Sequence, residues 1–361
     1  MAHQSSTTSK QIIRTLNKYE PRSLHHEVDV VWKDAFGCTV TDAEGEEYID
    51  FTSGIFVANV GHAHPQVLDA IEYQLNKRLL HSYVFPTEIR AKLVKKLCEM
   101  TGFEKCYLCS TGSEAVEATI RIIKASRTGS VFQLPDEFHG STWGAKHLEV
   151  LGQSPKLKAG IIVEGYRGYD AHFYDKEVIP ELESLQDEDV LLCFDEIQSG
   201  FGRTGKLFAY EHYGVKPDLI VIGKGLGGGM PISAVLGSVQ LLDAPDDLTS
   251  THTGNPICCA AALASIKVLE DEKLVERAER MGGWLEGVLR FNFPKHQIRG
   301  KGMVWALDVD DTDEIVDKCA EKGLLLIKTH RGTIKIGPPL TISQETLSEG
   351  LTILRDVINE T

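Results

Sequence analysis

The middle of the chain contains four short apolar segments, each of which ends in polar or small residues. They cover residues 106–109, 160–163, 190–194 and 219–222, and a fifth candidate covers residues 233–236. Helical patterns separate these segments, and such alternation predicts an α/β fold with a largely parallel sheet. Ligands of open α/β sheets bind at the carboxyl ends of the strands. This arrangement selects Ser113, Glu164, Asp195 and Lys224 as candidate site residues.

Lys224 follows the segment 219–222 and lies in a glycine-rich turn over residues 223–229. A lysine at the end of a buried strand is partly desolvated, which lowers its pKa and makes its amine a nucleophile. The glycines allow a bulky cofactor to approach the backbone. A solvated loop lysine is the alternative interpretation, and a P-loop is disfavoured because the Gly-Lys-Ser/Thr order is missing.

Asp195 ends the segment 190–194 and is followed three residues later by Gln198. A carboxylate at the end of a buried strand is costly unless it faces a cation. The protonated pyridine nitrogen of pyridoxal 5'-phosphate (PLP) is such a cation, and Gln198 could then reach the phenolic oxygen of the cofactor. The alternatives are a helix cap, a metal ligand, or the Asp-Glu pair of an ATPase, which lacks its Walker A partner here.

A turn of small residues, 110–113, precedes a predicted helix and offers N–H groups and hydroxyls to a phosphate. A plain capped helix fits the same residues. Phe138 could stack its ring on the pyridine, although a lone aromatic at such a place is more often part of a core.

The net charge of −14 argues against a nucleic-acid partner or an anionic membrane surface, because both need clustered Lys and Arg. No apolar run is long enough to span a bilayer. The first ten residues are polar and rich in Ser and Thr, so we expect no secretory signal and a cytoplasmic location.

Metal and redox sites are disfavoured by the arrangement of Cys and His. Cys106 and Cys109 lie in a predicted strand, where their spacing places the two sulfurs on opposite faces. No second Cys-x-x-Cys follows, so we interpret all eight Cys as reduced thiols and expect no metal site. For His62 and His64, a tight turn before a helix is favoured because no third ligand is evident.

The most specific stretch of the chain is Phe-Asp-Glu-Ile-Gln-Ser-Gly-Phe-Gly-Arg-Thr-Gly at residues 194–205, followed by Pro-Asp at 217–218 and Gly-Lys at 223–224. Further motifs lie at residues 110–115, 138–140, 251–256 and 337–340. With these motifs, the chain resembles the class III, ornithine/4-aminobutyrate-type aminotransferases, from about residue 50 to residue 342.

The resemblance implies the fold type I of PLP-dependent transferases. A large PLP-binding domain with a mostly parallel seven-stranded sheet is expected over residues 61–262. A small α+β domain is expected from both termini, residues 1–60 and 263–361. The resemblance also implies a homodimer whose active sites lie at the subunit interface.

Carried over by position, Lys224 is the catalytic lysine that forms a Schiff base with the cofactor. Asp195 binds the pyridine nitrogen and Gln198 approaches the phenolic oxygen. Gly112 and Ser113 hold the phosphate.

The remaining expected roles belong to residues farther from the lysine. Phe138 stacks on the ring, and His139 and Glu164 complete the cofactor-binding set. Thr251 reaches the phosphate of the neighbouring subunit. Phe56 is expected in the substrate pocket.

Two expected substrate residues depart from the family pattern. Relatives that use amino acids carry an Arg before Pro-Pro-Leu for the substrate carboxylate, whereas this chain has Lys335, which lacks the bidentate fork. Relatives often have a second Glu that gates this Arg, whereas this chain has Tyr169. We therefore expect no Arg–Glu switch, which argues against use of glutamate and 2-oxoglutarate. A shortened segment between residues 140 and 160 further predicts an open pocket that tolerates amines or larger substrates.

The resulting prediction is ping-pong transamination between an amine or amino acid donor and a keto acid acceptor. Another class III PLP reaction, by an aminomutase, racemase, lyase or decarboxylase, stays open. A non-catalytic PLP-binding subunit is the third alternative, against which the retained lysine argues.

Overall fold

The computed structural model describes residues 8–24, 28–175, 177–329 and 331–361. Its central sheet has seven strands in the order β4-β10-β9-β8-β7-β5-β6. These are β4 (Lys105–Cys109), β5 (Ser130–Gln133), β6 (Glu149–Val150), β7 (Lys158–Glu164), β8 (Leu191–Asp195), β9 (Leu219–Ile222) and β10 (Ser233–Gly237). Only β10 runs antiparallel to its neighbours within this sheet. The predicted mostly parallel seven-stranded sheet is therefore confirmed.

The central strands are continuous apolar runs because helices cover the sheet on both faces. Every residue of β8, β9 and β10 is buried, as expected for strands covered on both sides. The two faces belong to separate hydrophobic clusters, and Cys106 and Cys109 pack in different ones. Their predicted opposite orientation is confirmed, and all eight Cys are free thiols.

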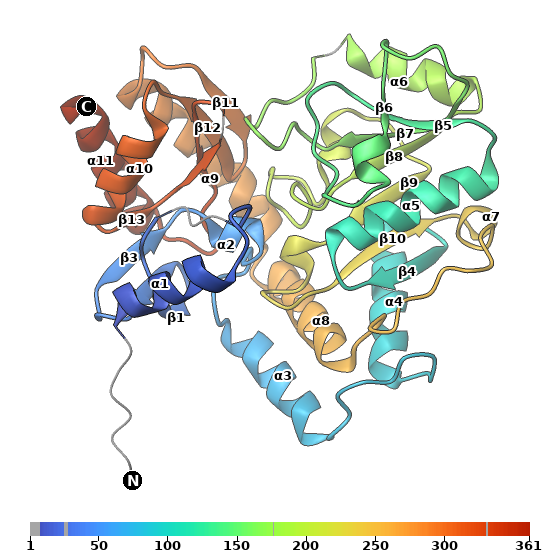
Figure 1. Ribbon diagram of the computed structural model, residues 1–361, viewed down its shortest axis with the longest axis horizontal. Coiled ribbons are helices and arrows are strands. Elements are labelled where there is room, and N and C mark those ends of the chain that lie inside the picture. Colours follow the sequence, from blue (N-terminus) through green and yellow to red (C-terminus); the bar gives the residue numbers. More distant parts are fainter. Residues whose placement is uncertain (1–7, 25–27, 176, 330) are drawn as a thin grey trace.

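Most helices of the central part flank this sheet, whereas α3 lies farther from it, beside α8 (Figure 1). The central helices are α3 (Pro65–Asn76), α4 (Glu88–Thr101), α5 (Gly112–Ser126), α6 (Val178–Asp187), α7 (Val239–Leu242) and α8 (Pro256–Asp271), with 3-10 turns η1 (Ala145–His147), η2 (Ala209–His212) and η3 (Lys224–Leu226). Helix α8 is apolar around most of its circumference and packs against both α3 and α4. The predicted domain boundary at 262 falls inside α8, so we propose to place it after Asp271 instead.

The two ends of the chain lie together beside the central sheet, as the blue and red ribbons of Figure 1 show. One small sheet has the order β1-β2-β3-β13 and the other β11-β12-β15-β14. The strands are β1 (Trp32–Phe36), β2 (Thr39–Asp42), β3 (Glu47–Asp50), β11 (Ile298–Lys301), β12 (Val304–Asp308), β13 (Leu324–Leu325), β14 (Ile327–Thr329) and β15 (Thr333–Ile336). The helices are α1 (Ser9–Tyr19), α2 (Ser53–Phe56), α9 (Leu274–Asn292), α10 (Thr312–Glu321) and α11 (Gln344–Glu360). Because β13 pairs in parallel with β3, the small α+β domain built from both termini is confirmed.

The pattern of residues 32–50, with one Asp-x-x-Gly turn, predicts a single hairpin, but the structure has three strands here. The Asp-x-x-Gly turn lies between β2 and β3, where the Asp42 carboxylate accepts the N–H groups of Glu44 and Glu46, both at 2.9 Å. The additional strand arises because Gly37, at φ +59°, turns the chain between β1 and β2. A two-strand interpretation missed this second turn because only the first has a strong sequence signature.

His62 and His64 lie in the turn before α3, as expected. His62 Nε2 is 2.7 Å from Asp50 Oδ2, and the His64 side chain caps α3 by accepting the Gln66 N–H. Among the described residues no cluster of His, Cys, Asp and Glu is suited to a metal ion. Within that same part of the chain, no helix is long and apolar enough to cross a membrane. Residues 1–7 of the polar start lie outside the described residues.

Candidate active site

Eight of the predicted site residues line one cavity at the carboxyl ends of the central strands. They are Gly112, Ser113, Phe138, His139, Glu164, Asp195, Gln198 and Lys224. The cavity has a volume of about 200 Å³. The parallel strands bring these residues together because their carboxyl ends meet at the same edge of the sheet.

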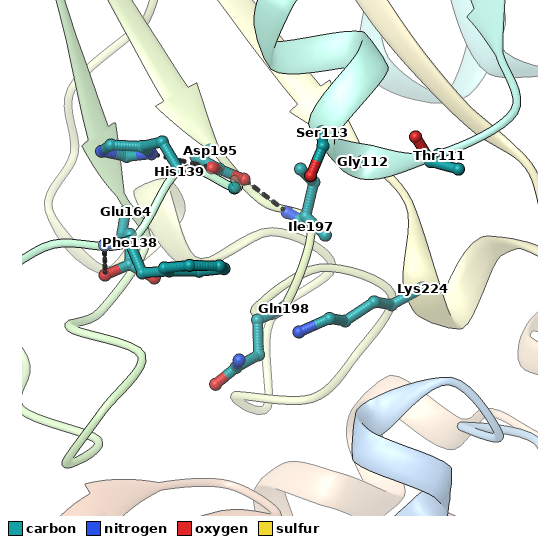
Figure 2. A pocket seen from close by; sticks show the side chains of 11 residues that line it. Thr111, Gly112, Ser113, Phe138, His139, Glu164, Asp195, Ile197, Gln198 and Lys224 are labelled. Carbon is teal, nitrogen blue, oxygen red and sulfur yellow. Dashed lines mark hydrogen bonds and ion pairs between the residues drawn. The ribbon is translucent and has the colours of Figure 1, made fainter. Parts of the chain in front are cut away.

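Lys224 directly follows the turn after β9 and extends into the same space as Gln198 (Figure 2). Burial lowers the pKa of Lys224, and the negative charges of Asp195 and Glu164 oppose this effect. Its backbone has φ +36°, an unusual conformation for a residue with a side chain. Such strain is typical of functional positions held by the surrounding structure.

Asp195 is the last residue of β8, and both of its carboxylate oxygens are engaged. Oδ2 lies 2.8 Å from His139 Nδ1, and Oδ1 accepts the N–H of Ile197 at 3.1 Å. The side chain is 5% exposed, so its remaining access is to the cavity. Figure 2 shows His139 on the side of Asp195 away from Lys224.

Gln198 is oriented by two donors on its amide oxygen. Lys335 Nζ donates to Oε1 at 2.7 Å, and Tyr166 Oη donates to the same atom at 3.1 Å. The amide oxygen must therefore point toward these donors. Among the described residues the Gln198 N–H₂ group has no hydrogen bond, so it is free to donate toward the cavity.

The amino end of α5, where the sequence predicts a phosphate cradle, lies at the cavity. Thr111 caps the helix by accepting the N–H of Glu114 at 3.2 Å, which leaves the N–H groups of Gly112 and Ser113 at the cavity. Glycine is required opposite this turn, because a Cβ at Gly140 would lie 2.5 Å from Ser113 Oγ. Gly140 also has φ +100°, which disfavours any side chain there.

Phe138 and Glu164 form the wall opposite Lys224. Glu164 Oε2 accepts the N–H groups of Phe138 at 3.2 Å and Gly168 at 3.0 Å, so this carboxylate holds two loops together. Burial and the nearby Glu137 raise the pKa of Glu164 to about 8. Tyr169 packs edge-on against the Phe138 ring, with 6.2 Å between ring centroids. The Arg331 guanidinium lies over the Tyr169 ring, 4.8 Å from Cζ to the ring centroid.

Four predicted site residues do not line the cavity of this chain, and one of them is Tyr169, which packs on Phe138. Lys335, on β15, lies behind Gln198 and donates to the Gly168 carbonyl at 2.5 Å. Phe56 is 1% exposed and lies under the Lys335 ammonium, 4.5 Å from Nζ to the ring centroid. Thr251 lies on an exposed loop, where its carbonyl accepts a hydrogen bond from His81 Nε2 at 2.7 Å.

The donor set of the cavity fits PLP. A half-buried amine faces the same space as a buried carboxylate and an amide N–H₂, and a helix amino terminus with glycine opposite it leaves room and N–H donors suited to a phosphate. A model of the family "Aminotransferase class-III" matches residues 21–161 and 145–358.

The chain belongs to the class III aminotransferases.

The two matched segments of this class III aminotransferase overlap at residues 145–161, which largely coincide with the segment where the sequence predicts a shortening. The chain is 32% identical to the acetylornithine aminotransferase of Methanocaldococcus jannaschii, over 96% of this chain and 97% of the relative. It is 34% identical to the 5-aminovalerate aminotransferase of Pseudomonas aeruginosa, over 98% and 99% of the two chains.

The structural comparison leads to the same family. The ornithine aminotransferase of Toxoplasma gondii, crystallised with PLP in partial occupancy at its active site, superposes with a TM-score of 0.90. It is 28% identical, over 98% of this chain and 96% of that chain. The protein is therefore a PLP-dependent transaminase of fold type I, as predicted, and none of these comparisons supports the mutase, racemase, lyase, decarboxylase or non-catalytic alternatives.

Sequence reasoning missed several residues that organise the site. Glu137 was overlooked, although an acidic residue two positions before His139 was a usable signal. Arg203 is fully buried and donates to the carbonyls of Met303 at 2.9 Å and Pro338 at 2.5 Å. It thereby ties the motif at 194–205 to the small domain, a contact that no local pattern reveals.

Proposed function

We propose that Lys224 is the catalytic amine of this transaminase and that Asp195 is the partner of the pyridine nitrogen. One observation carries the proposal: a half-buried lysine and a buried carboxylate reach one cavity from adjacent strands, β9 and β8. PLP, when bound, supplies an electron-withdrawing ring that stabilises negative charge on the substrate carbon. Gly112 and Ser113 then hold its phosphate and Phe138 covers its ring.

Lys224 Nζ acts as the base that removes a proton from the substrate carbon bearing the amino group. Its lowered pKa supports this role, because a neutral amine is needed to accept the proton. Gln198 is held by Lys335 and Tyr166 so that its N–H₂ group can donate to the phenolic oxygen of the cofactor. His139 and Glu164 contribute from behind, by orienting Asp195 and the loop of Phe138.

The test is a donor and acceptor screen with PLP-loaded protein. Each amine or amino acid is added alone, and loss of the visible absorbance of bound PLP identifies a donor. Each keto acid is then added, and recovery of the absorbance identifies an acceptor. Lack of any absorbance change with a broad donor panel would contradict the proposed roles.

We further propose that Lys335 binds a carboxylate of the substrate. The Lys335 residue is 3% exposed, and its ammonium group lies over the Phe56 ring. Among the described residues, no carboxylate lies within ion-pair distance of Lys335 Nζ. A buried cation without a counter-ion favours an incoming anion. The relatives named for acetylornithine and 5-aminovalerate act on compounds that carry both an amine and a carboxylate.

The absence of a carboxylate at Tyr169 supports a pocket without the Arg–Glu switch, open to simple amines as well. The same donor screen tests this point with matched pairs, such as 5-aminovalerate and pentylamine. Activity with α-amino acids alone would contradict an open pocket.

We propose that the protein is a homodimer in which Thr251 completes the partner's phosphate site. Support comes from a band of exposed apolar side chains around α3 and the following loop: Leu68, Tyr73, Leu75, Leu79, Leu80, Tyr83, Val84 and Phe85. Such an exposed apolar patch is typical of a subunit interface. Sedimentation velocity of the wild type and of a Leu80→Glu, Phe85→Asp double variant would test it, and a monomeric wild type would contradict it.

We also propose a cytoplasmic location, supported by the eight free Cys, since disulfides are rare in that compartment. Fractionation of the producing cells, with detection of the untagged protein, would test this. Recovery in a secreted or membrane fraction would contradict it.

A further inference from the structure

Behind Asp195, a row of polar side chains continues into the protein away from the cavity. His139 Nδ1 lies 2.8 Å from Asp195 Oδ2, and His139 Nε2 lies 3.2 Å from Glu137 Oε2. Tyr174 Oη then donates to Glu137 Oε1. The side chains of His139 and Glu137 are fully buried, so solvent does not supply their hydrogen bonds. Four polar groups thus depend on one another for partners.

Glu137 is surrounded by hydrogen-bond donors on both oxygens. Oε2 accepts the Leu134 N–H at 2.9 Å in addition to His139, and Oε1 accepts the Glu164 N–H at 2.8 Å in addition to Tyr174. The two backbone N–H groups can only donate, so each oxygen of Glu137 must accept at least one hydrogen bond. An ionised carboxylate accepts about four hydrogen bonds, so this environment matches the charged form of Glu137.

The charge on Glu137 determines the hydrogens on His139. A proton on Nε2 is needed for the bond to Glu137, which leaves Nδ1 facing Asp195. If His139 were neutral, Nδ1 would be an acceptor and Asp195 would have to carry a proton. If His139 is cationic, both ring nitrogens donate and Asp195 stays ionised. Burial lowers the pKa of His139, but the hydrogen bonds to Asp195 and Glu137 outweigh it and raise the pKa to about 10.

We propose that Glu137 is a positioning residue that, through His139, keeps Asp195 ionised and aimed at the pyridine nitrogen of PLP. Charges then alternate along the row, from Glu137 (negative) through His139 (positive) and Asp195 (negative) to a protonated pyridine. Each member stabilises its neighbours in a low-dielectric environment. The inference rests on the proposed role of Asp195, which the same experiment tests separately.

The central variant is Glu137→Gln, which keeps the shape and removes the charge. Each carboxylate oxygen accepts a backbone N–H, so an amide N–H₂ group meets a donor in either orientation. With its amide oxygen toward His139, the variant side chain still accepts from Nε2 but no longer stabilises a cationic ring, so Nδ1 loses its proton and faces Asp195 as an acceptor. Tyr174→Phe is the matched control, because it removes one hydrogen bond to the same carboxylate and leaves its charge.

The primary readout is the ¹⁵N NMR shift of the pyridine nitrogen in protein loaded with [¹⁵N]PLP. Wild type and Tyr174→Phe are expected to show a protonated nitrogen. Glu137→Gln and Asp195→Asn are expected to move the resonance toward the unprotonated position, and Glu137→Gln to weaken PLP binding by about tenfold, as loss of one charged hydrogen bond does. Glu137→Asp keeps the negative charge, so it should retain part of the wild-type nitrogen protonation and part of the wild-type PLP affinity.

Two outcomes overturn the inference in distinguishable ways. If Asp195→Asn shifts the resonance and Glu137→Gln does not, Glu137 has no part in setting the charge of Asp195. If neither variant shifts it, the proposed role of Asp195 itself is wrong. A second measurement needs no variant: ¹⁵N-labelled wild type should show both ring nitrogens of His139 protonated at neutral pH, and a single protonated nitrogen overturns the inference.

Discussion

Asp195 and Lys335 are both buried charges beside the cavity, but their surroundings differ. Asp195 lies in a row of partners that extends through His139 to Glu137, with every oxygen of the row engaged. Within the described part of the chain, Lys335 donates only to uncharged acceptors, the Gly168 carbonyl and the Gln198 amide. A compensated charge holds one fixed arrangement. A buried cation without a counter-ion favours the binding of an anion, and a substrate carboxylate can bind there and be released.

The largest effect on turnover is expected at Lys224, the proposed base. Lys224→Ala should lower turnover by about 10⁴-fold, since it removes the proposed base, whereas Lys206→Ala at an exposed ion pair should not. Steady-state rates with the best donor and acceptor from the screen measure this. Turnover close to wild type in Lys224→Ala would exclude the proposed base.

On the compensated side of the comparison, Asp195→Asn should reduce turnover by about 10²- to 10³-fold, as the loss of a preorganised charge does. The new N–H₂ group would also face the N–H of His139. Asp189→Asn, at an exposed ion pair with Arg127, is the control. Equal rates for both variants would show that the Asp195 row is only structural.

On the uncompensated side, Lys335→Ala should raise the KM of a keto acid about 10- to 100-fold, as loss of a charged hydrogen bond does. An aldehyde acceptor without a carboxylate should be much less affected. Lys335→Arg keeps the charge and serves as the matched control. If KM rose equally for both acceptors, Lys335 would not bind the carboxylate.

The same lysine predicts a pH dependence. Burial and the positive charge of Lys224 lower the pKa of Lys335 to about 7, with Arg203 acting in the same direction and Glu164 and Asp170 opposing it. Lys335 is charged below this pKa and neutral above it, so keto acid binding should weaken as the pH rises through 7. The pH profile of kcat/KM measures this, and Lys335→Arg should lose that fall because arginine stays charged.

The smallest effect is expected at Tyr169, which contacts Phe138 but neither Asp195 nor Lys335. Tyr169→Ala removes the edge-on ring contact and the cation–π contact of Arg331, and should weaken PLP binding about two- to fivefold. Tyr169→Phe keeps the ring and should bind PLP like wild type. Equilibrium titration of the apoprotein measures both, and a similar loss in the two variants would point to the hydroxyl.

The sequence located the strand-end residues well because their signal is local. An apolar run followed by Asp195 or Lys224 identifies a buried strand and its end, and parallel packing brings such ends to one edge. The turn before α3 and the orientations of Cys106 and Cys109 were predicted for the same reason. The extra strand β1 was missed, because the turn at Gly37 that precedes β2 has no strong sequence signature.

The chain alone determined the family, the sheet, and which side chains can perform PLP chemistry, since motifs and hydrophobic periodicity are written locally. Only the tertiary structure decided their charge relations. Glu137 and Tyr174 are 37 residues apart, and Lys335 and Gln198 are 137 apart, yet each pair is hydrogen-bonded. Burial and the full set of partners decide whether a charge is compensated, and both are properties of the folded chain.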